Sequence, residues 1–576
     1  MSAATAVNGH HDAATIAHVP VLADDVDVIV NAAENANADA LAAAVAIAPE
    51  STNGNGTNGN STSSNSNNGN QCNDSRGWVV QKFGGTSVGK FAVKIAEDIV
   101  RPGLKHNKIA VVCSARSTGK KVEGTTSRLL EIYGVLESVN VVNDAESVHY
   151  ESLVSEYERL VYVISEDHVA AAELHIRDED IRLRLIREVR DECKEIVDYR
   201  AAAQRWHLEI DSRSKDRIVS FGEKLSCRFV AALLQDRGVD SEYVDLSDVV
   251  HYKSTRKGLG QDFYEHMAAT LREKVLACGH RVPVLTGYFG TVPGGLMDGE
   301  IGRGYTDLCA ALIAVGIQAE ELQVWKEVDG IFTADPTKVP TARLLPTITP
   351  SEAAELTFYG SEVIHHLTMD QAIHATPPIR IRIKNVKNPQ GNGTIILPDP
   401  KLDSHRLSHS RSSSSLSLRK SPKRPTAVTI KDKISVINVH SNKRSISHGF
   451  FAKVFSILDS RQLSVDLIST SEVHVSMAIH SANIPDGELQ KAKADLEQCG
   501  EVSVLNNMAI LSLVGAEMKN MIGVAGHMFS TLGENHVNIE MISQGASEIN
   551  ISCVIDAYEA TRAMNILHTN LFTFLE

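Results

Sequence analysis

The sequence predicts an α/β protein of several domains: a three-layer sandwich around a mostly parallel sheet, followed by two smaller ferredoxin-like units. The 576 residues exceed the roughly 250 to 300 that a single hydrophobic core organises. From residue 77 onward, strand-like and helix-like segments alternate, which is typical of α/β sandwiches. Beyond residue 427 the chain repeats itself at an offset of 74 residues.

Composition excludes several classes of protein. The chain is 43% hydrophobic and 22% charged, and no apolar run approaches the roughly 20 residues of a membrane helix. Its net charge of −14 is opposite in sign to that of a general nucleic-acid binder. The eight cysteines are scattered without a CxxC pair, and no targeting segment is recognisable. We therefore expect a cytoplasmic protein that binds neither nucleic acid nor membrane.

The elements follow in order along the chain. Residues 1–76 are rich in Ala, Asn, Gly, Ser and Thr, and we expect a disordered low-complexity tail. Residues 77–400 form the predicted sandwich, with strands at Trp78–Val80, Ile109–Cys113, Tyr243–Leu246 and Val282–Thr286 and a helix near 127–137. Within it, residues of about 138–217 are charged and have helical periodicity, which predicts a helical insert with a structural role.

Residues 401–427 are serine-rich and basic and read as a linker, either a plain connector or a target of phosphorylation. The units 428–505 and 506–576 each give strand, helix, strand, strand. Their alignment pairs Gly449 with Gly523 and Phe455 with Phe529. Two βαββαβ units account for this repeat.

A glycine-rich turn follows the first strand and allows two interpretations. Residues 84–90 satisfy GxxxxGK, but Phe91 stands where a P-loop needs Ser or Thr to hold Mg²⁺. In the other interpretation Lys82 is the cation on a transferred phosphoryl group. The backbone of Gly84, Gly85, Thr86 and Ser87 then cradles the anion. A P-loop-type NTPase remains the alternative.

Several motifs in order resemble one family. They are KFGGTSVGK (82–90), VVCSARS (111–117), SFGEKLS (220–226), GYFG (287–290), GRGYTDLCAA (302–311), WKEVDGIFTADPTKV (325–339) and ELTFYGSEVIH (355–365). Together they resemble the aspartate kinases of the monofunctional fungal type, which have an amino-acid kinase fold. The two C-terminal units resemble ACT regulatory domains. Only the tail and the linker fall outside the resemblance.

The resemblance implies transfer of the γ-phosphoryl of ATP to the side-chain carboxylate of L-aspartate, giving 4-phospho-L-aspartate and ADP. This is the first step of the aspartate pathway to threonine and methionine. A carboxylate nucleophile with a pKa of about 3.9 needs no general base, so catalysis rests on positioning and electrostatics. The implied catalytic residues are Lys82, Arg303 and Asp307. Mg²⁺ is expected with ATP, and we name no protein residue as its ligand.

The resemblance also implies how aspartate is bound. Arg303 would hold the α-carboxylate and Glu223 the α-ammonium. Thr306, Ser114 and Thr126 would complete the substrate site, with Thr125 a rival because the stretch STGKKVEGTT is longer than the usual family form. Tyr305 stands where many members carry glycine.

The resemblance implies that further residues bind ATP together with the glycine turn. They are Lys326, Glu327, Phe332, Thr337, Lys338 and Lys387. Many relatives have tyrosine at the position of Phe332 and arginine near Thr337. Core packing is an equally good interpretation of Phe332, because aromatic side chains are usually core.

ACT domains bind small amino acids, which implies an effector site. Its candidate residues are Ser447, Gly449, Phe451, Ser464, Asp466, Gln544 and Asn550. The helix start at Gly449 suits a carboxylate, although these residues also suit ordinary turns and caps. Threonine is the expected effector and lysine the alternative. Exposed repeat edges predict a homo-oligomer. A non-catalytic amino-acid sensor is the second alternative function.

Overall fold

The computed structural model describes residues 76–119, 124–142, 147–251, 259–299, 301–302, 304–359, 364–397, 424–441, 449–481, 484, 487–545 and 549–573. The predicted tail up to residue 75 and linker residues 401–423 lie outside the described residues, as do Arg303 and Ser447. Among the described helices, none is long and apolar enough to cross a membrane.

The structure has two parts, which we name by what the family resemblance implies: the catalytic part, residues 76–397, and the regulatory part, residues 424–573. The catalytic part is built on an eight-stranded sheet in the order β3-β5-β2-β1-β7-β9-β10-β8. All neighbouring strands run parallel except the pair β9 and β10, which confirms the predicted mostly parallel sheet. The strands are β1 (Trp78–Phe83), β2 (Lys108–Cys113), β3 (Ser241–Val244), β5 (Val282–Thr286), β7 (Glu321–Lys326), β8 (Thr347–Ile348), β9 (Arg380–Asn385) and β10 (Thr394–Ile396). Two short strands, β4 (Val250–His251) and β6 (Gly290–Thr291), pair separately.

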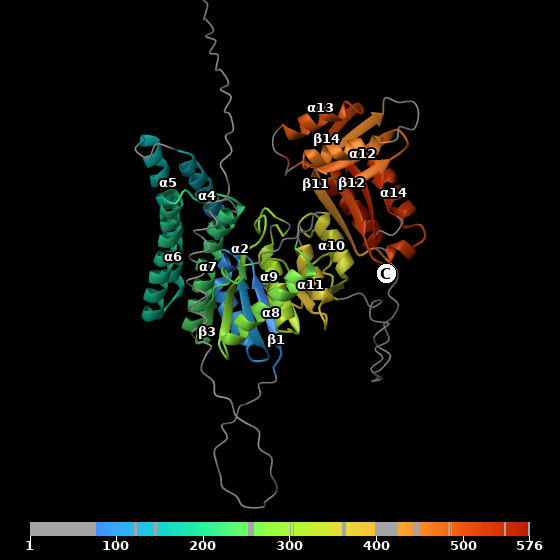
Figure 1. Cartoon of the computed structure of the whole chain (residues 1–576). Coiled ribbons are helices and arrows are strands. Elements are labelled where there is room, and N and C mark those ends of the chain that lie inside the picture. The colour runs from blue at the N-terminus through green and yellow to red at the C-terminus, as the bar shows by residue number, and fades with distance from the viewer. Residues whose placement is uncertain are drawn as a thin grey trace, which may run out of the picture. The chain divides into compact units, whose positions relative to one another are not determined.

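Helices cover both faces of this sheet (Figure 1). They are α2 (Gly85–Lys94), η1 (Ile95–Val100), α3 (Arg101–Gly103), α4 (Thr125–Val141), α5 (Val148–His175), α6 (Glu179–Arg205), α7 (Ser212–Asp236), α8 (Gln261–Ala277), α9 (Tyr305–Gly316), α10 (Pro350–Phe358) and α11 (His366–His374). Side chains alternate between the two faces of each strand, so each face of the sheet has its own hydrophobic core. In β2, Ala110 and Val112 pack with α8, α9 and α11, whereas Ile109, Val111 and Cys113 pack with α2 and α4 to α7. The result is a three-layer sandwich.

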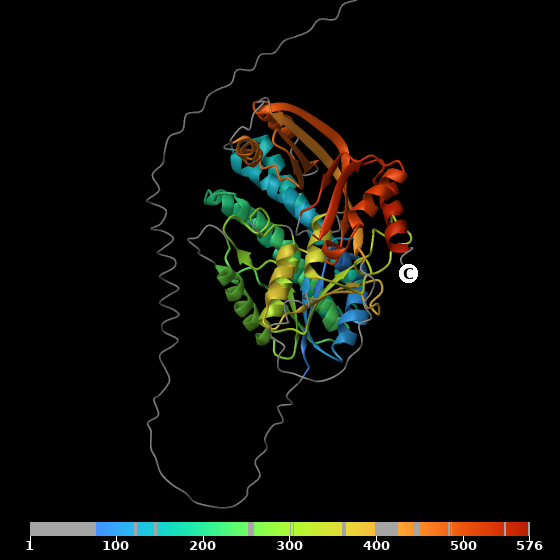
Figure 2. The same cartoon turned by 90° about the vertical axis from the view of Figure 1, so that its right-hand side faces the viewer.

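The helical insert consists mainly of α5 and α6, which lie side by side next to α7 (Figures 1 and 2). Ser147 and Asp178 cap their N-termini through side-chain oxygens. Tyr157 of α5 is fully buried, and its hydroxyl donates to the carbonyl of Ile196 in α6 at 2.8 Å. Apolar residues of both helices belong to the core beneath the sheet. The insert is therefore packed into the catalytic part.

The regulatory part has one six-stranded antiparallel sheet in the order β12-β13-β11-β14-β16-β15. Its strands are β11 (Ala427–Ser441), β12 (Leu467–Thr470), β13 (His474–His480), β14 (Gly500–Val514), β15 (Met541–Ser543) and β16 (Asn550–Asp556). Its helices are α12 (Phe450–Ser460), α13 (Glu488–Leu496), α14 (Val524–Glu534) and α15 (Ala560–His568), with the short turns η5 (Met518–Asn520) and η6 (Thr569–Thr573).

The two regulatory units are interlocked by the long strands β11 and β14. The N-terminal half of β11, residues 427–431, pairs with residues 510–514, and its C-terminal half pairs with the start of β14. The second unit thus takes one strand from the N-terminal end of the predicted first unit. The repeat extends to backbone detail, because Gly449 and Gly523 have φ values of 87° and 84° and cap equivalent helices.

The segment after β7 is packed into the regulatory part. Ala334 and Val339 belong to the hydrophobic core of the second unit. Its helix α15 carries His568, which is buried and hydrogen-bonds through Nε2 to the hydroxyl of Thr333 at 2.8 Å and through Nδ1 to that of Thr341 at 3.1 Å. The backbone N–H of Val428 in β11 donates to the carbonyl of Thr333 at 2.8 Å. The conformation of this segment therefore depends on the regulatory fold.

Two glycines give a matched test of the packing. A Cβ on Gly316, the last residue of α9, would lie 2.1 Å from the carbonyl oxygen of Ala268 in α8, whereas one on Gly134 in α4 would meet nothing within 4 Å. We expect Gly316→Ala to force α8 and α9 apart and to destabilise the fold by about 1–3 kcal/mol. Gly134→Ala should stabilise it slightly, because alanine is the better helix former. Thermal unfolding followed by circular dichroism measures both, and equal midpoints would contradict this account.

Candidate active site

The glycine turn lies between the end of β1 and the start of α2. A Cβ on Gly85 would lie 1.9 Å from the carbonyl oxygen of Ala115, and one on Gly89 would lie 2.1 Å from that of Ser117. Nothing lies within 4 Å of the corresponding position on Gly84. The turn is thus pressed against the segment after β2 on one side and open at Gly84. Helix N-termini of this kind attract anions, because their first N–H groups lack helical partners.

A buried ion pair stands beside the turn. Lys82 Nζ lies 2.6 Å from Asp307 Oδ1, and each side chain is only 12% exposed. Asp307 belongs to the first turn of α9, which Gly304 opens with a φ of 104°. Burial acts to raise the pKa of Asp307, but the charges of Lys82 and Lys326 hold that pKa below its usual value. The carboxylate is therefore ionised at neutral pH.

A second buried carboxylate, Glu223, comes from α7 on the opposite face of the sheet and meets the start of α9 at Thr306. Its Oε1 accepts from the hydroxyl of Thr306 at 2.7 Å, and its Oε2 accepts from the backbone N–H of Tyr288 at 2.5 Å. Burial raises the pKa of Glu223 to about 6, against the opposing effect of these hydrogen bonds. A Cβ on Gly287 would lie 2.4 Å from Thr306, so glycine at that position permits the contact.

The remaining candidates for the substrate site lie at the ends of neighbouring elements. Ser114 follows β2; its N–H donates to the carbonyl of Phe83 at 3.0 Å, and its carbonyl accepts from the hydroxyl of Ser226 at 2.8 Å. Thr125 and Thr126 open α4, where Thr125 is buried and Thr126 half-buried. Arg303 lies outside the described residues.

The candidate nucleotide residues are distributed over two places. Lys326 ends β7, the neighbour of β1, and lines a cavity of about 900 Å³ with Phe332, Thr337 and Lys338. Glu327 and Lys387 form an ion pair of 3.6 Å, and Lys387 Nζ lies 5.8 Å from the centroid of the Phe91 ring.

Part of this cavity was not predicted from the sequence, because one wall comes from the regulatory part. Residues 429–433 of β11 and His480 line it. Lys338 Nζ also lies 3.3 Å from Asp432 Oδ2 in that strand. No local pattern signals a contact between segments about 100 residues apart. Tyr288 lies in the motif GYFG, but the sequence does not predict its role. It contacts Glu223 through its backbone N–H, and the residue type does not indicate such a contact.

The candidate effector residues have varied surroundings. Gly449 caps α12 and Phe451 is 39% exposed on it, while Ser464 and Gln544 are exposed. Two of the candidates already have protein partners. Asp466 Oδ1 lies 2.9 Å from Lys431 Nζ, and Asn550 Nδ2 donates to Glu355 Oε2 in α10.

The sandwich, the anion-binding turn and the buried lysine together define an amino-acid kinase. In agreement, the model of the amino acid kinase family matches residues 77–385, and that of an ACT domain matches residues 511–571. The match with the amino acid kinase family includes the glycine turn at residues 84–90, so it favours this class over the P-loop alternative.

Individual relatives identify the family within this class. The chain is 54% identical over 503 residues to the aspartate kinase FUB3 of Gibberella moniliformis, covering 86% of this chain and 98% of the relative. It is 51% identical to the aspartokinase of Schizosaccharomyces pombe, covering 86% and 93%. Among solved structures it resembles E. coli aspartokinase III in complex with lysine and aspartate, with a TM-score of 0.63 and 25% identity over 86% of this chain and 99% of that one. This chain belongs to the aspartate kinase family and is an ATP-dependent kinase.

Substitution of two lysines near the glycine turn distinguishes the P-loop interpretation from the one in which Lys82 acts on the phosphoryl group. Lys82 is buried in the ion pair with Asp307, whereas Lys90 is exposed on α2. We expect Lys82→Met to lower kcat by about 10²- to 10³-fold, as loss of one preorganised charge at a transition state does. Lys90→Met should leave kcat within about twofold, as a surface substitution does. ADP release measures both variants, and the opposite order would contradict the assignment of Lys82.

Proposed function

We propose that the chain transfers the γ-phosphoryl of ATP to the side-chain carboxylate of L-aspartate, giving 4-phospho-L-aspartate and ADP, as the first step toward threonine and methionine. The observation that carries this proposal is the buried Lys82–Asp307 pair beside the open glycine turn, with the buried carboxylate of Glu223 nearby. A related solved structure, that of E. coli aspartokinase III in complex with aspartate and ADP, supports it; the TM-score is 0.57 and the identity 25%.

Residues of opposite charge bind the two charged α-groups of aspartate. Glu223 binds the α-ammonium of aspartate, since it is a buried anion whose two oxygens are oriented by Thr306 and Tyr288. Arg303 binds the α-carboxylate, with Ser114 and Thr126 as further hydrogen-bond donors. A bidentate guanidinium suits a planar carboxylate. This arrangement leaves the side-chain carboxylate of aspartate directed at the phosphates.

Phosphoryl transfer then needs cations rather than a base, because the nucleophile is already ionised. Lys82 neutralises charge on the transferred group, and the N–H groups after Gly84 bind phosphate oxygens. Asp307 orients Lys82 through the 2.6 Å contact, and Lys326 adds a second positive charge. Phe332, Thr337 and Lys338 bind the nucleotide along the cavity, with Glu327 and Lys387 beside it.

Mg²⁺ enters with ATP, and the site fits it. The ionised carboxylate of Asp307 is a hard oxygen donor at the position where the phosphates would lie, and Mg²⁺ generally uses one or two carboxylates together with phosphate oxygens and waters. When bound, the ion neutralises phosphate charge.

We further propose that threonine, or alternatively lysine, inhibits the enzyme by binding the regulatory part through Ser447, Gly449, Phe451, Ser464, Asp466, Gln544 and Asn550. The route to the active site is short, because Thr333 and Thr341 of the segment after β7 are held by His568 of α15. A shift of α15 would move the wall of the nucleotide cavity.

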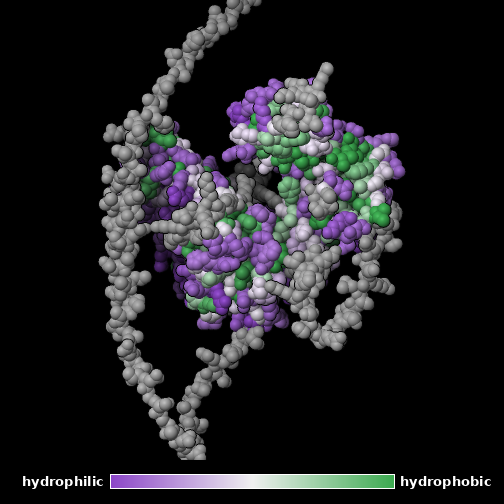
Figure 3. Space-filling model, turned by 45° about the vertical axis from the view of Figure 1, so that its right-hand side comes forward, coloured by the Kyte–Doolittle hydropathy of each residue, from purple (hydrophilic) through white to green (hydrophobic). Residues whose placement is uncertain are grey.

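Assembly of copies through the regulatory part is also proposed. Strands β12 and β15 are the edges of its sheet, and Ile468 and Ile542 on them are 37% and 47% exposed. Figure 3 shows hydrophobic residues gathered on the surface of this part. Unpaired edges and apolar patches favour association between chains. We place the enzyme in the cytoplasm.

The proposal is tested by ADP release with MgATP and, separately, L-aspartate, L-glutamate or N-acetylglutamate. We expect turnover with aspartate alone, and inhibition when threonine is added. Turnover with glutamate but not aspartate would overturn the substrate assignment. Inhibition by lysine and not by threonine would replace the effector while leaving the substrate unchanged.

The raised pKa of Glu223, about 6, predicts how aspartate binding depends on pH. Above pH 6 the group is ionised and binds an ammonium; as pH falls through 6 it is protonated and loses that attraction. We expect kcat/KM for aspartate to fall about tenfold per pH unit below 6, because this ratio follows the ionisation of the unbound enzyme. Glu223→Gln should give a low and flat profile between pH 5 and 8. An acid limb retained in that variant would assign the titration to another group.

A further inference from the structure

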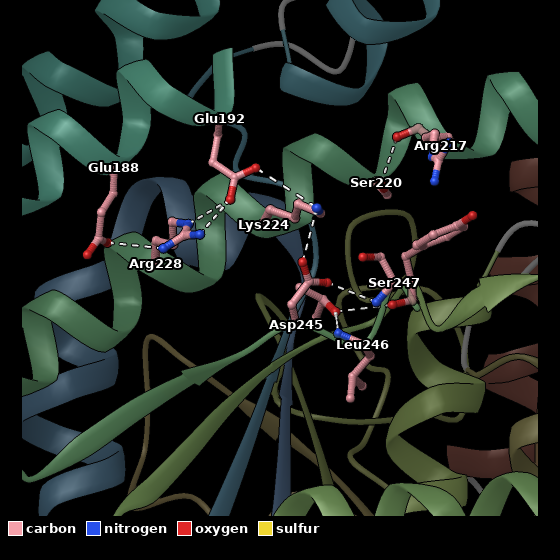
Figure 4. A network of polar contacts seen from close by, with 11 residues as sticks. Glu188, Glu192, Arg217, Ser220, Lys224, Arg228, Asp245, Leu246 and Ser247 are labelled. Atoms are coloured by element: carbon pink, nitrogen blue, oxygen red, sulfur yellow. Dashed lines mark hydrogen bonds and ion pairs between the residues drawn. The ribbon is translucent and has the colours of Figure 1, made fainter. Parts of the chain in front are cut away.

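A chain of charged side chains joins the helical insert to the helix that carries Glu223 (Figure 4). Glu192 of α6 is the centre of this chain, and its side chain is only 6% exposed. Its Oε1 accepts from Arg228 Nε at 2.9 Å and Nη2 at 2.6 Å. Its Oε2 lies 4.0 Å from Lys224 Nζ, which in turn lies 3.0 Å from Asp245 Oδ2. Lys224 therefore bridges the insert and the loop after β3.

The same loop leads back to Glu223 through hydrogen bonds. The backbone N–H of Leu246, next to Asp245, donates to the hydroxyl of Thr286 at 3.0 Å. That hydroxyl donates to the carbonyl of Tyr288 at 3.1 Å, and the N–H of Tyr288 donates to Glu223 Oε2. Because Glu223 and Lys224 are neighbours on α7, these contacts form a closed network that includes Glu223, the carboxylate proposed to bind the substrate.

Leu246 and Tyr288 are packed in the core, but one side of this region faces a cavity. Lys224, Ser247 and Tyr288 line a cavity of about 440 Å³ between α6, α7 and the ends of β3 and β5. A side chain next to a cavity lacks contacts on that side, so its position depends more on its polar partners. Burial acts to raise the pKa of Asp245, but the N–H of Ser247 and the charge of Lys224 hold that pKa below its usual value.

We infer that Glu192 is a positioning residue for aspartate: it holds Lys224 against Asp245 and thereby fixes the Leu246, Thr286 and Tyr288 contacts that orient Glu223. The inference rests on the proposed function, in which Glu223 binds the α-ammonium. Without Glu192, Lys224 keeps only Asp245 and Arg228 keeps only Glu188 as ion-pair partners, so the positions of both cations are less restrained. The insert then determines substrate affinity as well as packing.

The test replaces Glu192 by its uncharged isostere. Glu192→Gln removes the negative charge that lies 4.0 Å from Lys224 Nζ, and we expect it to raise KM for aspartate about tenfold. KM for MgATP should stay unchanged, because the glycine turn and Lys82 belong to other elements. Glu188→Gln is the matched control. Glu188 lies one turn earlier on α6 and forms an ion pair of 3.3 Å with Arg228 and not with Lys224. Its KM for aspartate should stay at the wild-type value.

A second pair of variants tests the bridge itself. Lys224→Met should raise KM for aspartate as Glu192→Gln does, and Lys224→Arg should restore it, because a guanidinium spans the same two carboxylates. Calorimetric titration of aspartate into each folded variant gives its affinity independently of turnover.

Equal KM values in Glu192→Gln and Glu188→Gln, or a parallel rise of both substrates' KM, would overturn the inference. If the wild-type enzyme fails to phosphorylate aspartate, the proposed function fails. If it succeeds and Glu192→Gln binds aspartate normally, only this inference fails.

Discussion

The buried ion pair between Lys82 and Asp307 is the constraint to which the rest of the catalytic part conforms. Two charges that are 12% exposed persist in a protein interior only when they are paired, so β1 and the first turn of α9 must be held in register. That requirement explains the close approaches around them. Gly85 lies against Ala115, Gly287 against Thr306, and Gly304 opens α9 with a left-handed backbone.

Electrostatics separates the two buried carboxylates into different tasks. The charges of Lys82 and Lys326 keep the pKa of Asp307 low, so it remains an anion beside Lys82; in the proposed function it orients that lysine. Burial raises the pKa of Glu223 to about 6 despite hydrogen bonds from neutral donors and the charge of Lys82, so it gains most from a further cationic partner. The positive charge of a substrate ammonium supplies that partner in the proposed function.

The connectivity of the chain links the regulatory part to the catalytic part. The second regulatory unit includes a strand from the N-terminal end of the predicted first unit, and its core includes Ala334 and Val339 from the segment after β7. In the proposed function, a ligand that repacks the regulatory sheet therefore acts on a wall of the proposed nucleotide cavity. Coupling of this kind requires a shared packed element and not a long pathway.

The sequence by itself determined the parallel sandwich, the internal repeat and the family, because strand periodicity, glycine turns and ordered motifs are local patterns. It also singled out Lys82 and Asp307, which the structure brings into contact. Only the tertiary structure decided that β11 walls the nucleotide cavity, that Tyr288 holds Glu223 by its backbone, and that Glu192 bridges to Lys224. These contacts join segments far apart in the chain, and no local pattern encodes which distant segment a side chain will meet.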